Sequence, residues 1–330
     1  MSVSPRVAVF GATGFVGRAT TAAIAGQGAE VVPIRTPRLP DMPASAASTF
    51  VRDHQDIVAD LAKSIAEVSV VVNAAGDPGA SSGDESALVA ANALVPGLLA
   101  AAVSLAGTQR FIHVSSAAVQ GARHTLDSTL EVSPFSPYSR SKALGEALVR
   151  EFAGDSAVIY RPPGVHGADR RVSRMTARIA RSRFSSVARP GTSPTPLTLL
   201  PNIADAIAFL ATTPQQPPII VAHPWEGLTT SSVLSLLGDR QPVQIPAPLA
   251  RAVVAALKVA GKAFAPLAGN ARRVEMLWFG QGQADSWLTA AGWRPPAGES
   301  AWRELGASFA GGRVEPRTVP NDEGRRAARA

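Results

Sequence analysis

The sequence predicts an α/β fold with a doubly wound parallel sheet and a smaller, less regular C-terminal region. Six short, apolar, β-rich runs alternate with alanine-rich helical stretches, and a glycine-rich turn directly follows the first run. Beyond Arg161 this alternation loosens into proline- and glycine-rich connections. Such alternation is typical of a parallel sheet covered by helices on both faces. The runs are "RVAVF" (6–10), "EVVPI" (30–34), "VSVVV" (68–72), "RFIHV" (110–114), "AVIY" (157–160) and "PIIVA" (218–222).

Pro33 is the one residue in these runs that breaks a local rule. Proline has no backbone N–H to donate to a strand ladder. We therefore expect the second strand to be short or bulged at this position.

Composition narrows the class of protein. The 330 residues are 46% hydrophobic, which indicates a globular chain of about two domains. We expect no membrane span and no signal peptide, and hence a cytoplasmic protein. The absence of cysteine excludes disulfides and thiolate chemistry, and the five histidines show no metal-ligand spacing, so no metal is predicted.

The net charge of +7 is concentrated in one arginine-rich segment and in the C-terminal tail. No nucleic-acid-binding motif accompanies these arginines, so nucleic acid is not a predicted partner. A site for an anionic small molecule and a solvated helix face are the two interpretations of the segment. Its arginines, here called the arginine cluster, are Arg170, Arg171, Arg174, Arg178, Arg181, Arg183 and Arg189.

The turn after the first predicted strand reads "GATGFVG", with Gly11, Gly14 and Gly17 at a strand-to-helix junction. Glycine permits the tight turn and lets a pyrophosphate approach the backbone, while the helix N-terminus offers unpaired amides. This turn predicts dinucleotide binding by a Rossmann-type sheet.

A second motif, "SPYSRSK" (136–142), places Tyr138 four residues before Lys142. On a helix these residues share one face, and Pro137 suits the first helical position. A nearby cation favours the phenolate and lowers the pKa of the phenol, which would make Tyr138 a general acid or base. Taken alone, the pair is also compatible with an ordinary surface helix.

Together the motifs resemble the extended short-chain dehydrogenase/reductase superfamily, the NAD-dependent epimerase/dehydratase family, over about residues 5 to 235. Several motifs in the right order are more specific than any one of them. Besides the two above, they are "VVNAAG" (71–76), "AANALVPGLLAAA" with Asn92, "FIHVSSAAVQG" (111–121) and "YRPPGVHG" (160–167).

The resemblance implies roles for particular residues. Tyr138 matches the proton donor or acceptor, Lys142 the lysine that lowers its pKa and holds the nicotinamide ribose, and Ser116 the hydroxyl that binds the reacting oxygen. Ser115 is the nearest alternative to Ser116. Asp53, at the end of the strand-like "TFVRD", matches an adenine-contacting acid, with Asp60 as the competing choice. The expected cofactor-binding residues are Gly11, Thr13, Gly14, Phe15, Val16, Gly17, Arg35, Asp53, Asn73, Ala74, Ala75, Gly76, Asn92, Tyr138, Lys142 and Pro162.

The expected cofactor is NADP, with NAD as the alternative. Where NAD-preferring members carry an acid after the second strand, this chain has Arg35, which suits a 2′-phosphate. The expected reaction is hydride transfer between the nicotinamide and a ketone or secondary alcohol. A sugar epimerase that works by transient oxidation and a non-catalytic dinucleotide-binding protein remain alternatives.

Departures from the family pattern bear on the substrate. Ala117 and Ala118 follow Ser116 where dehydratases tend to carry an Asp-Glu pair, so dehydration is not expected. Gln120 and His166 replace common tyrosines, and "TSPTPLTLLP" lacks the arginine that often holds a nucleotide-sugar diphosphate. The resemblance thus implies a small-molecule substrate but determines neither its identity nor whether it is anionic.

We predict an NAD(P)-binding domain over residues 1–165, to which 198–222 returns, a mainly substrate-binding region over 166–311, and a flexible tail over 312–330. A homodimer is left open. Membrane association is not expected. The segment "PLARAVVAALKVAGKAFAPLAG" nevertheless places Arg251, Lys258 and Lys262 on one face of an otherwise apolar helix, and this pattern also occurs in helices that bind a membrane surface or a partner.

Overall fold

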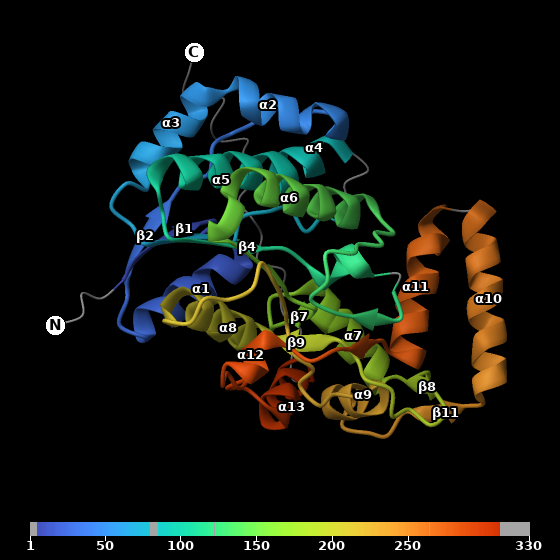
Figure 1. Cartoon of the computed structure of the whole chain (residues 1–330). Coiled ribbons are helices and arrows are strands. Elements are labelled where there is room, and N and C mark those ends of the chain that lie inside the picture. The colour runs from blue at the N-terminus through green and yellow to red at the C-terminus, as the bar shows by residue number, and fades with distance from the viewer. Residues whose placement is uncertain (1–4, 80–84, 122, 264, 311–330) are drawn as a thin grey trace, which may run out of the picture.

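The computed structural model describes residues 5–79, 85–121, 123–263 and 265–310. Its centre is a six-stranded parallel sheet in the order β10-β6-β4-β3-β1-β2 (Figure 1). Each of the six apolar runs forms one strand, so the predicted fold class is confirmed. The strands are β1 (Arg6–Phe10), β2 (Glu30–Ile34), β3 (Val70–Asn73), β4 (Arg110–Val114), β6 (Ala157–Arg161) and β10 (Ile220–Ala222).

Helices cover both faces of the sheet. Ala8 and Phe10 pack into the core beneath α2, α3, α5 and α6, whereas Val7 and Val9 pack into the core beside α1 and α8 (Figure 1). Alternate side chains of a strand point to opposite faces, so one apolar strand supplies both cores. The helices are α1 (Phe15–Gly26), α2 (Ala47–Asp53, after the short η1, Ala44–Ala46), α3 (Gln55–Ser64), α6 (Pro137–Ala153, followed by η4, Gly154–Ser156) and α8 (Leu200–Thr212).

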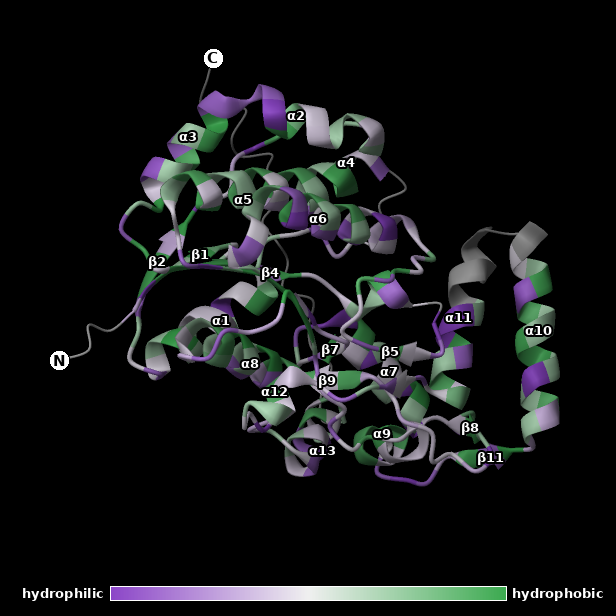
Figure 2. Cartoon of the chain, viewed as in Figure 1, coloured by the Kyte–Doolittle hydropathy of each residue, from purple (hydrophilic) through white to green (hydrophobic). Residues whose placement is uncertain are grey.

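One long helix in the layer that contains α6 is apolar and long enough to cross a membrane by length and composition alone. Residues 85–106 form α4 (Glu85–Val89), the π-helical turn η2 (Ala90–Leu94) and α5 (Val95–Ala106). Length and hydropathy would suffice for a span, but 78% of its most apolar window is buried inside the protein. Its hydrophobic colouring in Figure 2 therefore belongs to a core helix.

Pro33 lies within β2, which runs unbroken from Glu30 to Ile34. The expected shortening or bulge is absent from this strand. Strand β2 lies at the edge of the sheet, so the backbone N–H groups on its outer side have no neighbouring strand to bond. Proline, which lacks a backbone N–H, is tolerated at such an edge.

The C-terminal region packs its small elements around Trp302, which is 1% exposed. Two helices, α10 and α11, form a hairpin that projects from the body of the protein (Figure 1).

Within 198–222, β10 joins the central sheet beside β6, although the domain limits themselves stay a prediction. The predicted tail, 312–330, lies outside the described residues. The remaining elements are η3 (Ala117–Gln120), β5 (Thr125–Leu126), β7 (Gly164–His166), α7 (Arg171–Arg181), β8 (Ser186–Ala188), β9 (Leu197–Leu199), α9 (Thr230–Gly238), β11 (Val243–Ile245), α10 (Ala247–Ala263), α11 (Ala265–Phe279), β12 (Gly282–Gln283), α12 (Trp287–Ala290) and α13 (Glu299–Ser308).

Candidate active site

Most of the predicted site residues lie near the carboxyl ends of β1, β3, β4 and β6, whereas Arg35 follows β2 and Asp53 ends α2. This edge of an open parallel sheet is where ligands of doubly wound folds bind. The glycine-rich turn follows β1, the loop from Asn73 follows β3, Ser116 follows β4, and Pro162 follows β6. The Pro162 carbonyl accepts a hydrogen bond from the Ala117 amide at 2.8 Å, which ties the last two loops together.

The glycine-rich turn has the geometry that a pyrophosphate requires. Gly11 has φ of 78°, and a Cβ atom there would lie 2.6 Å from the Ala75 nitrogen. A Cβ on Gly17 would lie 2.0 Å from the Gly11 carbonyl oxygen. Helix α1 begins at Phe15, and its N-cap, Gly14, supplies no side-chain cap, so the first-turn amides remain available to an anion. Thr13 is exposed at the turn, and Val16 lies in the first turn of α1.

The loop after β3 packs against this turn. The Asn73 side-chain oxygen accepts a hydrogen bond from the Ala75 amide at 3.1 Å, and its amide nitrogen lies 3.2 Å from Nδ1 of the buried His113. Asn73 thereby fixes Ala74, Ala75 and Gly76 beside the glycine-rich turn. The two loops together form a cradle that suits a dinucleotide.

Asn92 holds the next part of this loop from within the π-helical turn. Its Oδ1 accepts from the Asp77 amide at 3.0 Å, and its Nδ2 donates to the Asp77 carbonyl at 3.0 Å and to Ser141 Oγ at 3.1 Å. Asn92 is fully buried. Its polar groups are thus engaged by the loop and by α6, so Asn92 positions Asp77.

Ser116 and Tyr138 are brought together as the sequence predicts. Helix α6 begins at Pro137 behind Ser136, whose hydroxyl forms a capping box with Ser139. This places Tyr138 in the first turn, close enough to Ser116 for the serine side chain to act on the pKa of its phenol. Ser115 instead donates to buried Glu146 at 2.5 Å. The geometry therefore pairs Ser116 with Tyr138.

Lys142 lies one turn further along α6 and is 5% exposed. Its Nζ donates to the Val114 carbonyl at 3.0 Å, at the end of β4. Burial lowers the pKa of Lys142 to about 8, and the Glu146 carboxylate acts in the opposite direction. The ammonium also faces the cofactor loop, since a Cβ on Gly76 would lie 3.1 Å from Nζ.

The pKa of Tyr138 is raised, which corrects the expected lowering by Lys142. Burial disfavours the phenolate and outweighs the hydrogen bond from Ser116 and the positive charge of Arg170, while the Asp77 carboxylate raises the pKa further. Tyr138 is therefore held as a protonated phenol at neutral pH.

The lowered pKa of Lys142 predicts a pH dependence of stability. In the unfolded chain Lys142 keeps its proton up to its ordinary pKa, so between about pH 8 and 10 the unfolded state binds more protons than the folded state. The unfolding free energy should therefore rise with pH across this window, by up to about 3 kcal/mol. Urea titrations of wild type and Lys142→Met at several pH values would test this. An identical pH slope in the two proteins contradicts it.

Arg170 and Asp77 bring opposite charges to Tyr138. The Arg170 guanidinium stacks over the Phe15 ring, with 4.9 Å to its centroid, and its buried Nε has no hydrogen-bond partner among the residues that the structure describes. Arg170 thus lies between the glycine-rich turn and Tyr138. By contrast, Arg171, Arg174 and Arg178 of the arginine cluster are exposed along α7.

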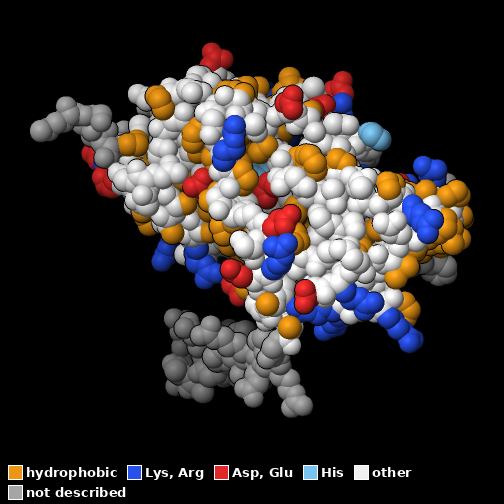
Figure 3. Space-filling model, turned by 90° about the horizontal axis from the view of Figure 1, so that it is seen from below, with side chains coloured by type: hydrophobic (Ala, Val, Ile, Leu, Met, Phe, Trp, Pro, Cys, Tyr) orange, Lys and Arg blue, Asp and Glu red, His pale blue; other side chains and the backbone are white. Residues whose placement is uncertain are grey.

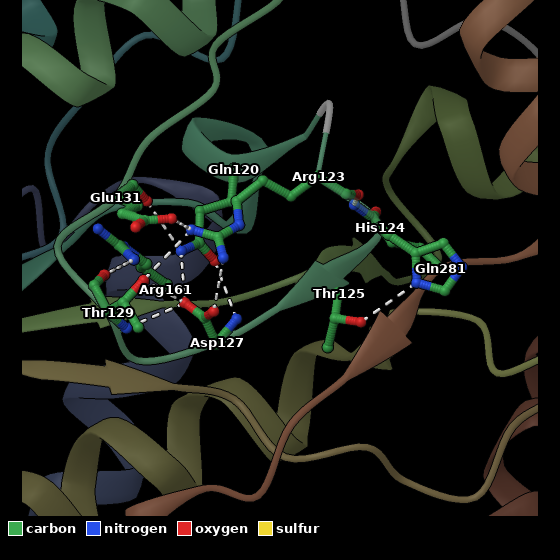
Figure 4. A network of polar contacts seen from close by, with 9 residues as sticks. All are labelled: Gln120, Arg123, His124, Thr125, Asp127, Thr129, Glu131, Arg161 and Gln281. Carbon is green, nitrogen blue, oxygen red and sulfur yellow. Dashed lines mark hydrogen bonds and ion pairs between the residues drawn. The ribbon is translucent and has the colours of Figure 1, made fainter.

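A buried ion pair between Arg161 and Glu146 lies next to the candidate site. Arg161 donates from Nε and Nη2 to both oxygens of Glu146, at 3.0 and 2.7 Å, and from Nη1 to the Thr129 carbonyl at 2.7 Å. Figure 4 shows Arg161 beside Gln120 and Asp127, which are hydrogen-bonded to each other at 2.7 Å. The pair therefore fixes α6, the end of β6 and the loop that follows Ser116. No sequence motif pointed to it, because its partners are fifteen residues apart.

Asp53 does not end a strand. The segment "TFVRD" belongs to α2, where Ala47 and Val51 are buried four residues apart and Asp53 is exposed at the helix C-terminus. The competing residue, Asp60, lies in α3 and pairs with Lys63 at 3.2 Å on the surface. Arg35 follows β2 directly and is exposed, as a residue available to a ligand would be.

The fold and the arrangement of these loops define a Rossmann-type enzyme of the NAD(P)-dependent oxidoreductase and epimerase class. Residues 7–221 match the family model described as NAD dependent epimerase/dehydratase family. The chain therefore belongs to this family, which confirms the resemblance and supports the predicted nicotinamide dinucleotide cofactor. No curated protein matches the sequence at a significant level.

Three solved structures illustrate the similarity of fold. TunA, an NAD-dependent NDP-hexosamine 5,6-dehydratase involved in tunicamycin biosynthesis, has a TM-score of 0.60 and 19% identity, covering 93% of this chain and 98% of its own. UDP-glucuronic acid 4-epimerase from Bacillus cereus, in complex with NAD, has a TM-score of 0.59 and 19% identity, covering 92% and 95%. The dTDP-4-dehydrorhamnose reductase from Bacillus anthracis str. Ames, in complex with NADP, has a TM-score of 0.58 and 16% identity, covering 93% and 99%.

Proposed function

We propose that this chain is an NADP-dependent oxidoreductase that reduces a ketone to a secondary alcohol or catalyses the reverse reaction. The observation that carries the proposal is the closeness of Tyr138 to Ser116, with Lys142 one helical turn after Tyr138 on α6 and facing the loop at Gly76. A nicotinamide dinucleotide, when bound, supplies or accepts the hydride. The substrate oxygen then has to gain or lose a proton in the same event.

Ser116 and Tyr138 are suited to this proton transfer. Their hydroxyls would hydrogen-bond the carbonyl oxygen, and the phenol of Tyr138 would release its proton as the oxygen gains negative charge. The raised pKa of Tyr138 keeps that proton in place at neutral pH, as a general acid for ketone reduction requires. The Lys142 ammonium would stabilise the phenolate left behind.

An epimerase that oxidises its substrate transiently is the second candidate, favoured by the similarity of fold to the UDP-glucuronic acid 4-epimerase. The purified protein should be incubated with ketones, secondary alcohols and nucleotide sugars while the absorbance of reduced nicotinamide is followed. Net turnover of added NADPH or NADP supports the oxidoreductase. Product formed on retained cofactor, without net turnover, would assign the epimerase instead.

Preference for NADP over NAD is proposed to depend on Arg35. Its guanidinium follows β2 at the position where a 2′-phosphate would be bound, and a charge-assisted contact of this kind is worth about 1.5–3 kcal/mol. Arg35→Ala should therefore weaken NADPH binding about tenfold or more and leave NADH binding nearly unchanged. Fluorescence titration of both cofactors measures this, and equal affinities in wild type would refute the assignment.

We further propose that the substrate carries an anionic group that Arg170 binds. The buried Nε without a partner and the position beside Tyr138 support this role. Arg170→Ala should raise the KM for the substrate about tenfold or more with little change in cofactor affinity. Arg174→Ala, which removes an exposed charge of α7, the helix that Arg170 precedes, is the matched control and should leave KM unchanged. Weaker cofactor binding in Arg170→Ala would instead assign this guanidinium to the cofactor.

A further inference from the structure

The outer face of α10 is apolar and uncovered in the described chain. Ala250 and Val254 are buried toward the rest of the hairpin. On the opposite side, Leu249, Val253 and Val259 are 57%, 37% and 67% exposed. These residues recur at helical spacing, with the exposed Ala252 and Ala256 between them, and form a continuous stripe. Figure 2 shows that the described part of α10 is largely hydrophobic, with hydrophilic residues between, and lies at the side of the molecule away from the central sheet.

A basic edge runs beside this apolar stripe. Arg251 and Lys258, two helical turns apart, line a groove of about 300 Å³ between α10 and α11 together with Val254, Ala255, Glu275 and Phe279. Lys258 and Arg272 both form ion pairs with Glu275. The Arg251 guanidinium lies 5.9 Å from the centroid of the Phe279 ring and forms no ion pair within the described residues. Helix α10 contains no acidic residue. The groove therefore keeps an excess of positive charge.

The charges and the apolar stripe discriminate between possible occupants. In a symmetric dimer built on this face, Arg251 and Lys258 of each copy would meet the same residues of the other, without an acid from α10 to compensate. The C-terminal residues 311–330 contain five arginines and, as large apolar residues, only Val314 and Val319, so they match neither the charge nor the stripe. A surface of anionic phospholipid matches both.

We propose that α10 is a peripheral membrane-binding element that lies along a bilayer containing anionic lipid. The apolar stripe would enter the boundary between headgroups and acyl chains, and lipid phosphates would approach Arg251 and Lys258 at the groove. Figure 3 shows hydrophobic side chains flanked by Lys and Arg at the end of the molecule where the hairpin lies. The hairpin lies at one side of the molecule (Figure 1), and Arg272 of α11 donates to the Gly121 carbonyl in the loop that follows Ser116.

Flotation of the full-length protein with phosphatidylcholine vesicles, with or without phosphatidylglycerol, tests this proposal. We expect binding to the anionic vesicles that weakens as salt is added. Val259→Asp should abolish flotation, and Arg251→Ala should lower the partition coefficient about fivefold. Leu105→Asp, at a residue 62% exposed on α5, and Arg178→Ala, on α7, are matched controls that should leave flotation unchanged.

The outcomes separate this proposal from the others. Binding to neutral and anionic vesicles alike, or anionic binding that is unaffected by both α10 variants, overturns it. Sedimentation that reveals a dimer dissociated by Val259→Asp, with no vesicle binding, assigns the stripe to a second copy. Because none of these readouts depends on turnover, a failure here leaves the proposed oxidoreductase function untouched, and circular dichroism verifies that each variant is folded.

Discussion

Tyr138→Phe should lower kcat by about 10²- to 10⁴-fold while cofactor affinity stays within about twofold. The substitution keeps the ring in the first turn of α6 and removes only the hydroxyl that lies near Ser116 and would carry the transferable proton. Steady-state kinetics with the best substrate from the screen, together with cofactor titration, measures both quantities.

Tyr160 offers a matched control, since it is the other tyrosine of the chain. Its hydroxyl lies 2.5 Å from Nδ1 of His223 in the core, away from Ser116. Tyr160→Phe should cost about 1–3 kcal/mol of stability through the lost buried hydrogen bond and leave kcat within a few-fold. If Tyr138→Phe retains wild-type turnover, the assignment of the general acid is wrong.

Arg161→Met should destabilise the protein by about 3–5 kcal/mol, the largest stability effect that we expect. The variant leaves the Glu146 carboxylate buried without its cation, because the side chains of Arg161 and Glu146 are 1% and 4% exposed. Urea denaturation followed by circular dichroism measures the unfolding free energy.

Helix α6 also supplies the control for this variant. Arg140 donates from two nitrogens to both oxygens of Glu85, at 2.9 and 3.0 Å, but these side chains are 49% and 45% exposed. Arg140→Met should therefore cost less than about 1 kcal/mol. Equal destabilisation by the two variants would show that burial does not set the strength of the Arg161–Glu146 pair.

The parts of the fold that the sequence predicts are those encoded by neighbouring residues. Apolar β-rich runs fix the six strands, and the glycines of the first turn fix its path, because a Cβ at Gly11 or Gly17 would collide with backbone. Ser136 and Pro137 define the start of α6, and hence the placement of Tyr138 and Lys142 on it.

The errors and omissions have non-local causes. In "TFVRD" the residues have strand propensity, but packing of Ala47 and Val51 against the core selects a helix, so tertiary contacts decide the structure around Asp53. The raised pKa of Tyr138 follows from burial, which no spacing reveals. The arginine cluster looked uniform, yet Arg170 differs because it precedes α7 and meets Phe15 from a distant segment.

Pro33 has a consequence for how copies of this protein can meet. The outer edge of β2 is a potential template for a strand of another chain, and such edges promote sheet extension and aggregation. Strand β2 has only five residues, and Pro33 removes one of their backbone N–H groups, which interrupts any ladder of hydrogen bonds with another strand. Glu30 adds a negative charge at the start of β2. Continuous pairing of two sheets through the outer edge of β2 is therefore interrupted at Pro33.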